Sequence, residues 1–321
     1  MECGTCGAHE HQLRFTAREQ QFGTNDPFEY FQCKTCGTLQ ISTIPPDLGR
    51  YYPSDYYSMV AADEPIAPLG RLKRFVRAAR TDYYINRVNP IGWAIDKYAH
   101  KYCDLSWEWF RGYASTRSRI LDVGCGYGDL LRQMRWRGFR HLTGIDPFIG
   151  DCIEADGLRI VRGELRDIDG CFDFMMLHHS LEHMPDPLSA LGEVRRLLRR
   201  RGAVLVRVPV AGTWAEQHYG VNWWGLDPPR HLFIPSRKGM SELARRAGFF
   251  VARYWCDSSE WILLASESYK RGFSPYDRDT KTWPPLVSRF SASEIEGARK
   301  RAADLNRAED GDTACLLLVL T

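Results

Sequence analysis

A nine-residue segment, Ile120 to Gly128, constrains the fold of this chain more than any other feature. Its sequence is Ile-Leu-Asp-Val-Gly-Cys-Gly-Tyr-Gly, and an amphipathic stretch follows it. The apolar residues predict a buried strand, and the alternating glycines predict a turn whose backbone a ligand can approach closely. The segment therefore predicts a strand–turn–helix cradle for a nucleotide. Glycine spacing alone is weak evidence, because flexible turns also use glycine.

A downstream carboxylate supports this interpretation. The next predicted strand, residues 141–145, leads directly to Asp146. A carboxylate at that position can accept hydrogen bonds from both hydroxyls of a ribose. The G-x-G-x-G spacing differs from that of the NAD fingerprint, and no pyrophosphate cradle is evident in the sequence. With Asp146 in the place of the ribose-binding acid, the segment resembles motif I of class I S-adenosylmethionine (SAM) methyltransferases.

The resemblance implies which residues hold the cofactor. Gly124 and Gly126 would approach the methionine part of SAM, and Asp122 would orient the loop. Glu164 would lie beside the adenine. The implied cofactor-binding residues are Asp122, Gly124, Cys125, Gly126, Asp146, Pro147, Glu164, Leu165 and His178. The alternative for Asp122 and Asp146 is a helix cap or turn, and for Glu164 an exposed surface carboxylate. Cys125 is interpreted as a small packing residue.

Strand and helix patterns alternate through the rest of the chain. Predicted strands cover 120–123, 141–145, 159–161, 172–177, 203–208, 250–255 and 314–320, and predicted helices end near 135 and 199 or cover 238–247 and 294–308. Such alternation is typical of a doubly wound parallel sheet. The predicted fold class is α/β, a Rossmann-like seven-stranded methyltransferase sheet preceded by a small zinc ribbon.

The predicted domain boundaries follow from these patterns. Residues 1–45 form the ribbon, and 46–112 form a linker and helical cover with helices at 72–80 and 94–110. Residues 113–321 form the methyltransferase domain. It contains an acceptor loop at 212–236 and a helical insertion at 257–312.

Two cysteine pairs near the amino terminus predict the ribbon. Cys3 and Cys6 form one Cys-x-x-Cys-Gly motif, and Cys33 and Cys36 form the other. Four thiolates complete a tetrahedral zinc site with no open position, so the predicted Zn²⁺ is structural. Strands are expected at 12–17 and 28–32. The alternatives are a redox dithiol pair or a disulfide clip, and the second motif makes both less economical.

Three histidines are candidates for a general base, which a hydroxyl or carbon-acid acceptor requires. His179 opens a segment that resembles the L-E-H-x-P-D-P signature common in this superfamily, in which Glu182 and His183 brace the loop. His218 and His231 follow the fifth predicted strand. The preferred order is His231, His179, His218.

The segment from Arg230 to Ser236 resembles the E-H-F-x-x-x-S segment of bacterial deoxysugar C-methyltransferases. In those enzymes the histidine is the base, and an amino-terminal four-cysteine module is also present. Arg230 replaces their acid, which puts deprotonation of a ketosugar in doubt. Trp223 and Trp224 either face a carbohydrate or form a buried aromatic cluster.

These features predict a SAM-dependent methyltransferase of polysaccharide biosynthesis that acts on a sugar, nucleotide-linked or within a glycan, at oxygen rather than carbon. The alternatives are an RNA methyltransferase that grips nucleic acid with its zinc ribbon, a methyltransferase of another secondary metabolite, and a non-catalytic protein that keeps the SAM fold. With 43 basic and 40 acidic residues, a nucleic-acid partner is not expected. The absence of a long apolar run predicts no membrane span and a cytoplasmic location.

Overall fold

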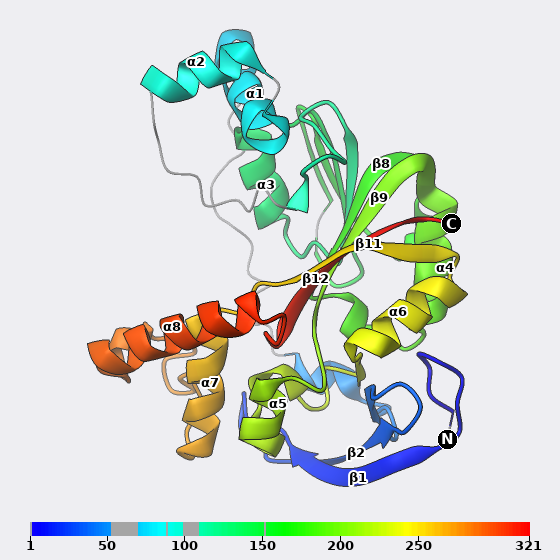
Figure 1. The fold of residues 1–321 in the computed structure, drawn as a ribbon, viewed down its shortest axis with the longest axis vertical. Helices are drawn as coiled ribbons and strands as arrows, with labels where there is room; N and C mark the ends of the chain where they lie inside the picture. The colour runs from blue at the N-terminus through cyan, green and yellow to red at the C-terminus, as the bar shows by residue number, and fades with distance from the viewer. Residues whose placement is uncertain (1, 53–69, 88, 99–108, 151) are drawn as a thin grey trace. The chain divides into compact units, whose positions relative to one another are not determined.

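The computed structural model describes all residues except 1, 53–69, 88, 99–108 and 151 (Figure 1). It divides into two compact units. The first contains residues 1–55, 179–191 and 207–316, and the second contains residues 56–178, 192–206 and 317–321. None of the described helices is both long enough and apolar enough to cross a membrane. The domain boundaries expected from the sequence differ from these units and stay a prediction.

The central sheet has eight strands in the order β11-β12-β9-β8-β4-β5-β7-β6. Their bounds are β4 Arg119–Val123, β5 His141–Asp146, β6 Ile153–Ala155, β7 Leu158–Arg162, β8 Phe172–His178, β9 Leu198–Pro209, β11 Phe249–Cys256 and β12 Thr313–Leu320. β4 pairs in parallel with both β5 and β8, and β5 pairs in parallel with β7. The α/β class is thereby confirmed, and the seven expected strands are joined by the short antiparallel strand β6.

Helices of the second unit are α1 Arg71–Asn86, α2 Pro90–Tyr98, α3 Asp129–Trp136 and the 3₁₀ turn η4 Leu165–Asp167. α1 and α2 contact each other (Figure 1). Most of the helix expected at 94–110 falls outside the described residues. Three aromatic rings pack inside the unit: Phe110 lies 5.5 Å from Phe139 and 5.4 Å from Phe174, between ring centroids.

One prediction about the basic run after α4 (Pro187–Leu197) is wrong. We expected the helix to continue to Arg199, but β9 begins at Leu198. The Arg199 guanidinium binds the Asp173 carboxylate at 2.6 Å, which ties this segment to the start of β8. A Cβ at position 202 would lie 2.9 Å from the Asp173 carbonyl oxygen, so the glycine permits close approach within the sheet rather than ending a helix.

The first unit contains a second sheet in the order β1-β2-β3-β10. Its strands are β1 His11–Arg18, β2 Pro27–Cys33, β3 Leu39–Ile41 and β10 Phe233–Ile234. The strands predicted at 12–17 and 28–32 are thus present and slightly longer. β10 lies about 200 residues after β3 in sequence and pairs with it antiparallel. The cysteine-bearing segment therefore shares a sheet with the later part of the chain.

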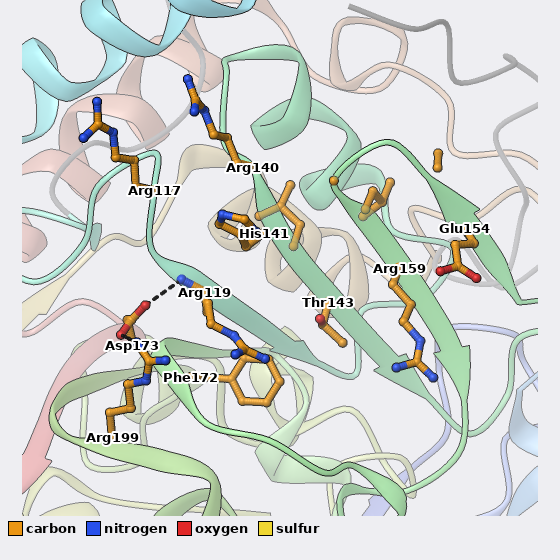
Figure 2. Close-up of a pocket in the computed structure, with 14 residues that line it drawn as sticks. Arg117, Arg119, Arg140, His141, Thr143, Glu154, Arg159, Phe172, Asp173 and Arg199 are labelled. Atoms are coloured by element: carbon orange, nitrogen blue, oxygen red, sulfur yellow. Dashed lines mark hydrogen bonds and ion pairs between the residues drawn. The ribbon is translucent and has the colours of Figure 1, made fainter.

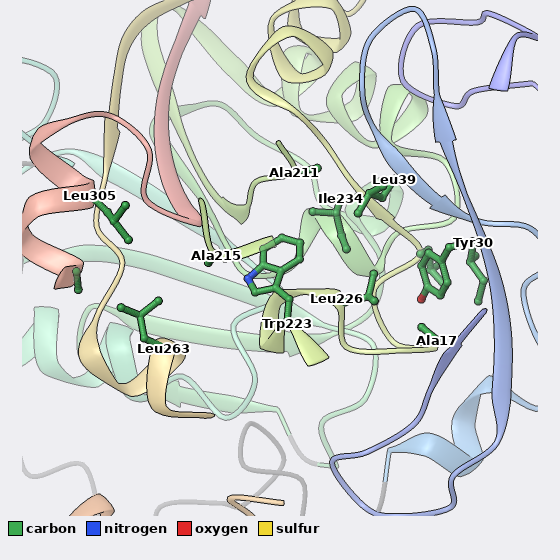
Figure 3. Close-up of a cluster of buried hydrophobic side chains, with 13 residues drawn as sticks. Ala17, Tyr30, Leu39, Ala211, Ala215, Trp223, Leu226, Ile234, Leu263 and Leu305 are labelled. Atoms are coloured by element: carbon green, nitrogen blue, oxygen red, sulfur yellow. The ribbon is translucent and has the colours of Figure 1, made fainter. Parts of the chain in front are cut away.

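Helices of the first unit are α5 Trp214–Tyr219, α6 Arg237–Arg246, α7 Glu260–Lys270 and α8 Ala292–Arg307, with 3₁₀ turns η1 Leu48–Tyr51, η5 Leu181–His183, η6 Gly220–Asn222, η7 Trp224–Leu226 and η8 Leu286–Ser288. One apolar core joins α5, η7, α7 and α8 to the second sheet (Figure 3). Trp223 lies in this core at 1% exposure, and its Nε1 donates to Asp312 Oδ2 at 2.8 Å. Since its ring is buried, Trp223 cannot stack on a sugar, and the buried-cluster interpretation is correct for this residue.

Candidate active site

The turn after β4 has the backbone conformation that its glycines permit. Gly126 and Gly128 have φ values of +52° and +82°, which side-chain-bearing residues rarely adopt. A Cβ at position 128 would also collide with Cδ1 of Ile160. The turn is tied to β5, because the Gly124 amide donates to the Ile145 carbonyl at 2.8 Å. The predicted strand–turn–helix, β4 to α3, is present in the second unit.

Asp146, at the end of β5, closes this turn. Its Oδ2 accepts a hydrogen bond from the Gly126 amide and its Oδ1 from the Phe148 amide, both at 2.9 Å. The carboxylate is partly exposed. Each carboxylate oxygen keeps a further lone pair after these bonds, so the group can accept hydroxyl donors from a ligand while it fixes the turn.

The burial and hydrogen bonding of Asp122 indicate whether a cofactor fits beside the turn. Its carboxylate is 3% exposed, and its Oδ1 has no hydrogen-bond partner among the described residues. Burial, together with the negative charge of Asp146, raises the pKa of Asp122 to about 8. Buried polar atoms are normally hydrogen-bonded. An acceptor without a partner, beside a glycine turn and a partly exposed carboxylate, therefore suits a ligand that carries hydrogen-bond donors, as SAM does.

The other residues predicted to hold the cofactor differ in exposure and in their contacts. Leu165 is 8% exposed, Pro147 is exposed, and the exposed Glu164 pairs with Arg166 at 2.8 Å. Cys125 is a free cysteine whose Sγ would lie 2.5 Å from a Cβ at Gly144, as a small packing residue would. His178, the last residue of β8, lies 4.4 Å from the Trp109 ring, between centroids.

A separate basic cavity of about 620 Å³ lies at the opposite edge of the sheet (Figure 2). Its lining includes the first residues of β4, β5, β7 and β8, so it opens at the amino ends of the strands and not at the glycine turn. Five arginines line it: Arg117, Arg119, Arg140, Arg159 and Arg199. The cavity is therefore distinct from the candidate cofactor site, although both belong to the second unit.

In the first unit, the four cysteines of the two Cys-x-x-Cys motifs come together. Cys3 Sγ lies 3.7 Å from Cys36 Sγ, and Cys6 Sγ lies 3.6 Å from Cys33 Sγ. These separations are too long for disulfides and close to the ~3.8 Å edge of a tetrahedron with zinc–sulfur bonds of about 2.3 Å. The amides of Gly7 and Gly37 donate to the Cys3 and Cys33 carbonyls, which closes each knuckle.

His179 and Glu182 form a hydrogen-bonded pair in the first unit. His179 Nδ1 lies 3.2 Å from Glu182 Oε1, with the histidine side chain 30% exposed and the glutamate fully buried. Burial raises the pKa of Glu182, but the His179 hydrogen bond and the nearby histidines outweigh it and hold the pKa below its usual value. The carboxylate stays ionised, so Nδ1 carries the proton and Nε2 is left to accept one.

The backbone of His179 is strained, with φ +49°. A non-glycine residue in the left-handed region is uncommon, and such strain concentrates at functional sites. The conformation is held because the His179 amide donates to the Arg207 carbonyl at 2.8 Å. The sequence offered no signal for this strain, whereas the spacing of His179 and Glu182 could have indicated their pairing.

The other two histidine candidates differ from His179. His231 has a side chain that is only 11% exposed, and its Nδ1 donates to the Gly225 carbonyl at 2.8 Å. His218 is exposed, and its ring stacks on Trp214 at 4.5 Å between centroids.

The pairing of His179 with a buried carboxylate is the feature that sequence reasoning missed, because it assigned Glu182 a bracing role only.

Arg230 replaces the acid expected from the family motif, and it is buried without any exposed surface. Its guanidinium binds Asp227 at 2.5 Å and Glu19 at 3.1 Å, and it donates to the Tyr51 carbonyl at 3.1 Å. A guanidinium has no acceptor atom and stays protonated, so Arg230 cannot take a proton from substrate as the family's acid would. Its role in the described structure is to join segments far apart in sequence.

Replacing Arg230 by alanine is expected to destabilise the protein by about 3–5 kcal/mol, because two carboxylates lose their buried partner. The matched control is Arg237→Ala, since that guanidinium is 57% exposed in its pair with Glu309 and should contribute at most about 1 kcal/mol. Urea denaturation of both variants measures the difference. Equal losses in the two variants would show that the buried network does not stabilise the fold.

In comparisons with known proteins, this chain is similar to methyltransferases. Residues 95–253 match the family described as "Methyltransferase domain". A tRNA U34 carboxymethyltransferase from Geobacter sp. (strain M21) is 27% identical over 168 residues, which covers 44% of this chain and 49% of that protein. A ubiquinone biosynthesis O-methyltransferase from Alkalilimnicola ehrlichii is 37% identical over 99 residues, covering 27% of this chain and 40% of the relative.

Among solved structures, a SAM-dependent methyltransferase from Mesorhizobium loti aligns with a TM-score of 0.40 at 14% identity, covering 63% of this chain and 90% of that one. A TM-score of this size transfers no site or substrate. The chain spans about half the length of the tRNA-modifying relatives it matches, so their substrates do not transfer either.

Proposed function

We propose that this chain, whose residues 95–253 match a methyltransferase domain family, uses SAM to transfer a methyl group to an oxygen of a sugar acceptor. The observation that carries the methyl transfer is the candidate cofactor site: a glycine turn with positive φ, closed by Asp146 and backed by the unpartnered Asp122 oxygen. SAM, when bound, supplies an electrophilic methyl group on a sulfonium.

The chain's own residues would bind the cofactor at the carboxyl edge of the sheet. Asp146 would accept the ribose hydroxyls, the glycine turn would leave room for the methionine part, and Asp122 would accept a donor from it. Glu164 and Leu165 would flank the adenine. Ligands of doubly wound sheets bind at this edge, where the strand order reverses. Here the reversal falls between β4 and β8.

His179 is proposed as the general base. It directly follows β8 in the sequence, and its Nδ1 lies 3.2 Å from the buried Glu182 carboxylate. With Nδ1–H directed to Glu182, Nε2 can take the proton of an acceptor hydroxyl as the oxygen attacks the methyl group. The partly exposed His179 is more accessible to an acceptor than the buried His231, which reverses the order expected from the sequence.

The sugar acceptor rests on the family resemblance of residues 230–236 and of the four-cysteine module. A screen of nucleotide-sugars with SAM labelled in its methyl group tests it, with product detected by mass spectrometry. A mass gain of one methyl group on a sugar hydroxyl is the expected result. Methylation of other small metabolites with none of the sugars would refute this acceptor class and leave methyl transfer itself intact.

The alternative acceptor is RNA, and the arginine-lined cavity favours it. Of its five arginines, Arg199 is ion-paired with Asp173, whereas the described residues give Arg140 and Arg159 no carboxylate partner. Phosphate binding there would show a steep dependence on salt. RNA binding that falls with salt in the wild type and is lost in Arg140→Ala/Arg159→Ala would favour this candidate over a sugar.

A structural zinc ion at Cys3, Cys6, Cys33 and Cys36 is also proposed, and the tetrahedral spacing of the sulfurs supports it. Cys36→Ser is expected to lose about one zinc per chain and to unfold at lower temperature, because a structural zinc contributes folding energy directly. Metal analysis by mass spectrometry checks the count. The exposed free cysteine variant Cys152→Ser is the control and should keep the metal. Unchanged zinc in Cys36→Ser would refute the site.

A further inference from the structure

A second cluster of metal-ligating side chains lies in the first unit, separate from the cysteines. Glu182, His183 and His231 each place one ligating atom within 4.8 Å of the others. Two backbone contacts hold the segments that carry them: the Leu232 amide donates to the Glu182 carbonyl at 2.8 Å, and Tyr30 Oη donates to the His231 carbonyl at 2.8 Å.

Both histidines are fixed in the same tautomer. His183 Nδ1 lies 2.9 Å from the Arg230 carbonyl and 3.1 Å from Tyr52 Oη, which can accept, and His231 Nδ1 lies 2.8 Å from the Gly225 carbonyl. A carbonyl oxygen only accepts, so each Nδ1 carries a proton and each Nε2 keeps its lone pair. Metal-binding histidines are oriented in this way by a hydrogen bond from the nitrogen that does not bind the metal.

Only one of the two carboxylate oxygens of Glu182 has a hydrogen-bond partner among the described residues. Glu182 is fully buried; its Oε1 accepts from His179, while its Oε2 has no hydrogen-bond partner in the described part of the chain. Glu182 also forms no ion pair there with an arginine or lysine. A buried, unsatisfied carboxylate oxygen is costly, and it points to a ligand that brings positive charge.

The two buried or half-buried arginines of this region already have carboxylate partners. Arg230 pairs with both Glu19 and Asp227, and Asp227 Oδ2 lies 3.9 Å from His231 Nε2. The single positive charge of Arg230 is therefore shared by two buried carboxylates. Arg207, whose charge interacts with Glu182, is paired with Asp257 at 2.7 Å. The surroundings of Glu182 thus carry more buried negative charge than these arginines neutralise.

We propose that Glu182, His183 and His231 bind a divalent transition-metal ion, for which Zn²⁺ is the best match. Two imidazoles and one carboxylate are a common zinc ligand set, and three protein ligands leave a coordination position for water or an acceptor oxygen. In a tetrahedral zinc site with bonds of about 2.0–2.1 Å the ligand atoms are about 3.4 Å apart, so side-chain rotations that bring the three atoms together from within 4.8 Å close the site. This inference goes beyond the proposed function, and only the expected total of two ions rests on the proposed cysteine-bound zinc.

Metal counting on the full-length protein tests the site. After equilibrium dialysis against Zn²⁺, the wild type should hold two ions per chain and His183→Gln/His231→Gln should hold one. His218→Ala, which changes a histidine outside the cluster, should keep two. An equal metal count in the wild type and in the double variant would overturn the proposal.

Cobalt substitution of the wild type avoids dependence on a variant that fails to fold. Co²⁺ bound by the four cysteines gives intense thiolate-to-metal charge-transfer absorption, whereas Co²⁺ bound by Glu182, His183 and His231 gives ligand-field bands only. Two bound equivalents, of which one adds no charge-transfer absorption, are expected. If every bound equivalent gave charge-transfer absorption, the second site would be ruled out.

Discussion

Replacing Asp146 by alanine is expected to abolish the thermal stabilisation that SAM gives the wild-type protein. At SAM concentrations near 100 times the dissociation constant, binding to the native state stabilises it by about 2.7 kcal/mol. The variant loses the carboxylate proposed to hold the ribose and also the acceptor for the Gly126 and Phe148 amides. Differential scanning fluorimetry with and without SAM measures the effect.

The control for this experiment is Asp169→Ala, which removes an exposed carboxylate just before β8. It removes the same charge at the amino end of the sheet, away from the glycine turn, and should keep the full SAM response. Comparison of the melting temperatures without SAM separates loss of binding from loss of stability. A SAM response in Asp146→Ala equal to that of the wild type would refute the ribose assignment.

Replacing His179 by alanine is expected to lower turnover by about 10²–10⁴-fold, the usual contribution of a positioned base. SAM-dependent stabilisation should persist, because His179 is not proposed to contact the cofactor. Glu182→Gln keeps an acceptor for Nδ1–H but removes the negative charge, so a smaller loss is expected. Turnover is measured with labelled SAM on the acceptor that the screen identifies.

His218→Ala supplies the matched control, since His218 is exposed and stacks on Trp214 without a carboxylate partner. Its turnover should equal that of the wild type. Full activity of His179→Ala, together with loss of activity in His231→Ala, would move the base to His231 and restore the order that the sequence suggested.

Local patterns predicted the parts of the structure that depend on neighbouring residues. The strand, glycine turn and helix from Arg119 to Trp136 could be predicted because hydrophobic periodicity and glycine spacing act over a few residues. The same is true of β5 and its terminal Asp146. The Cys-x-x-Cys spacing likewise predicted that Cys3, Cys6, Cys33 and Cys36 would come together, which the structure shows.

Features that depend on distant segments could not be predicted in this way. Arg230 contacts Glu19 across 211 residues of sequence, and nothing near either residue indicates the pair. The helical prediction for Arg199 failed for the same reason, because Asp173 on β8 draws that segment into the sheet. The environment of His179 depends on the burial of Glu182, which local spacing does not fix.

A crystal structure with S-adenosylhomocysteine, supported by isothermal titration calorimetry, tests the central claim most directly. The ligand should lie along the turn from Gly124 to Gly128, with its ribose hydroxyls within hydrogen-bond distance of Asp146 and a donor on Asp122 Oδ1. Calorimetry should show one binding site per chain. No heat of binding, and no ligand at the turn, would contradict the assignment of this chain as a SAM-dependent enzyme.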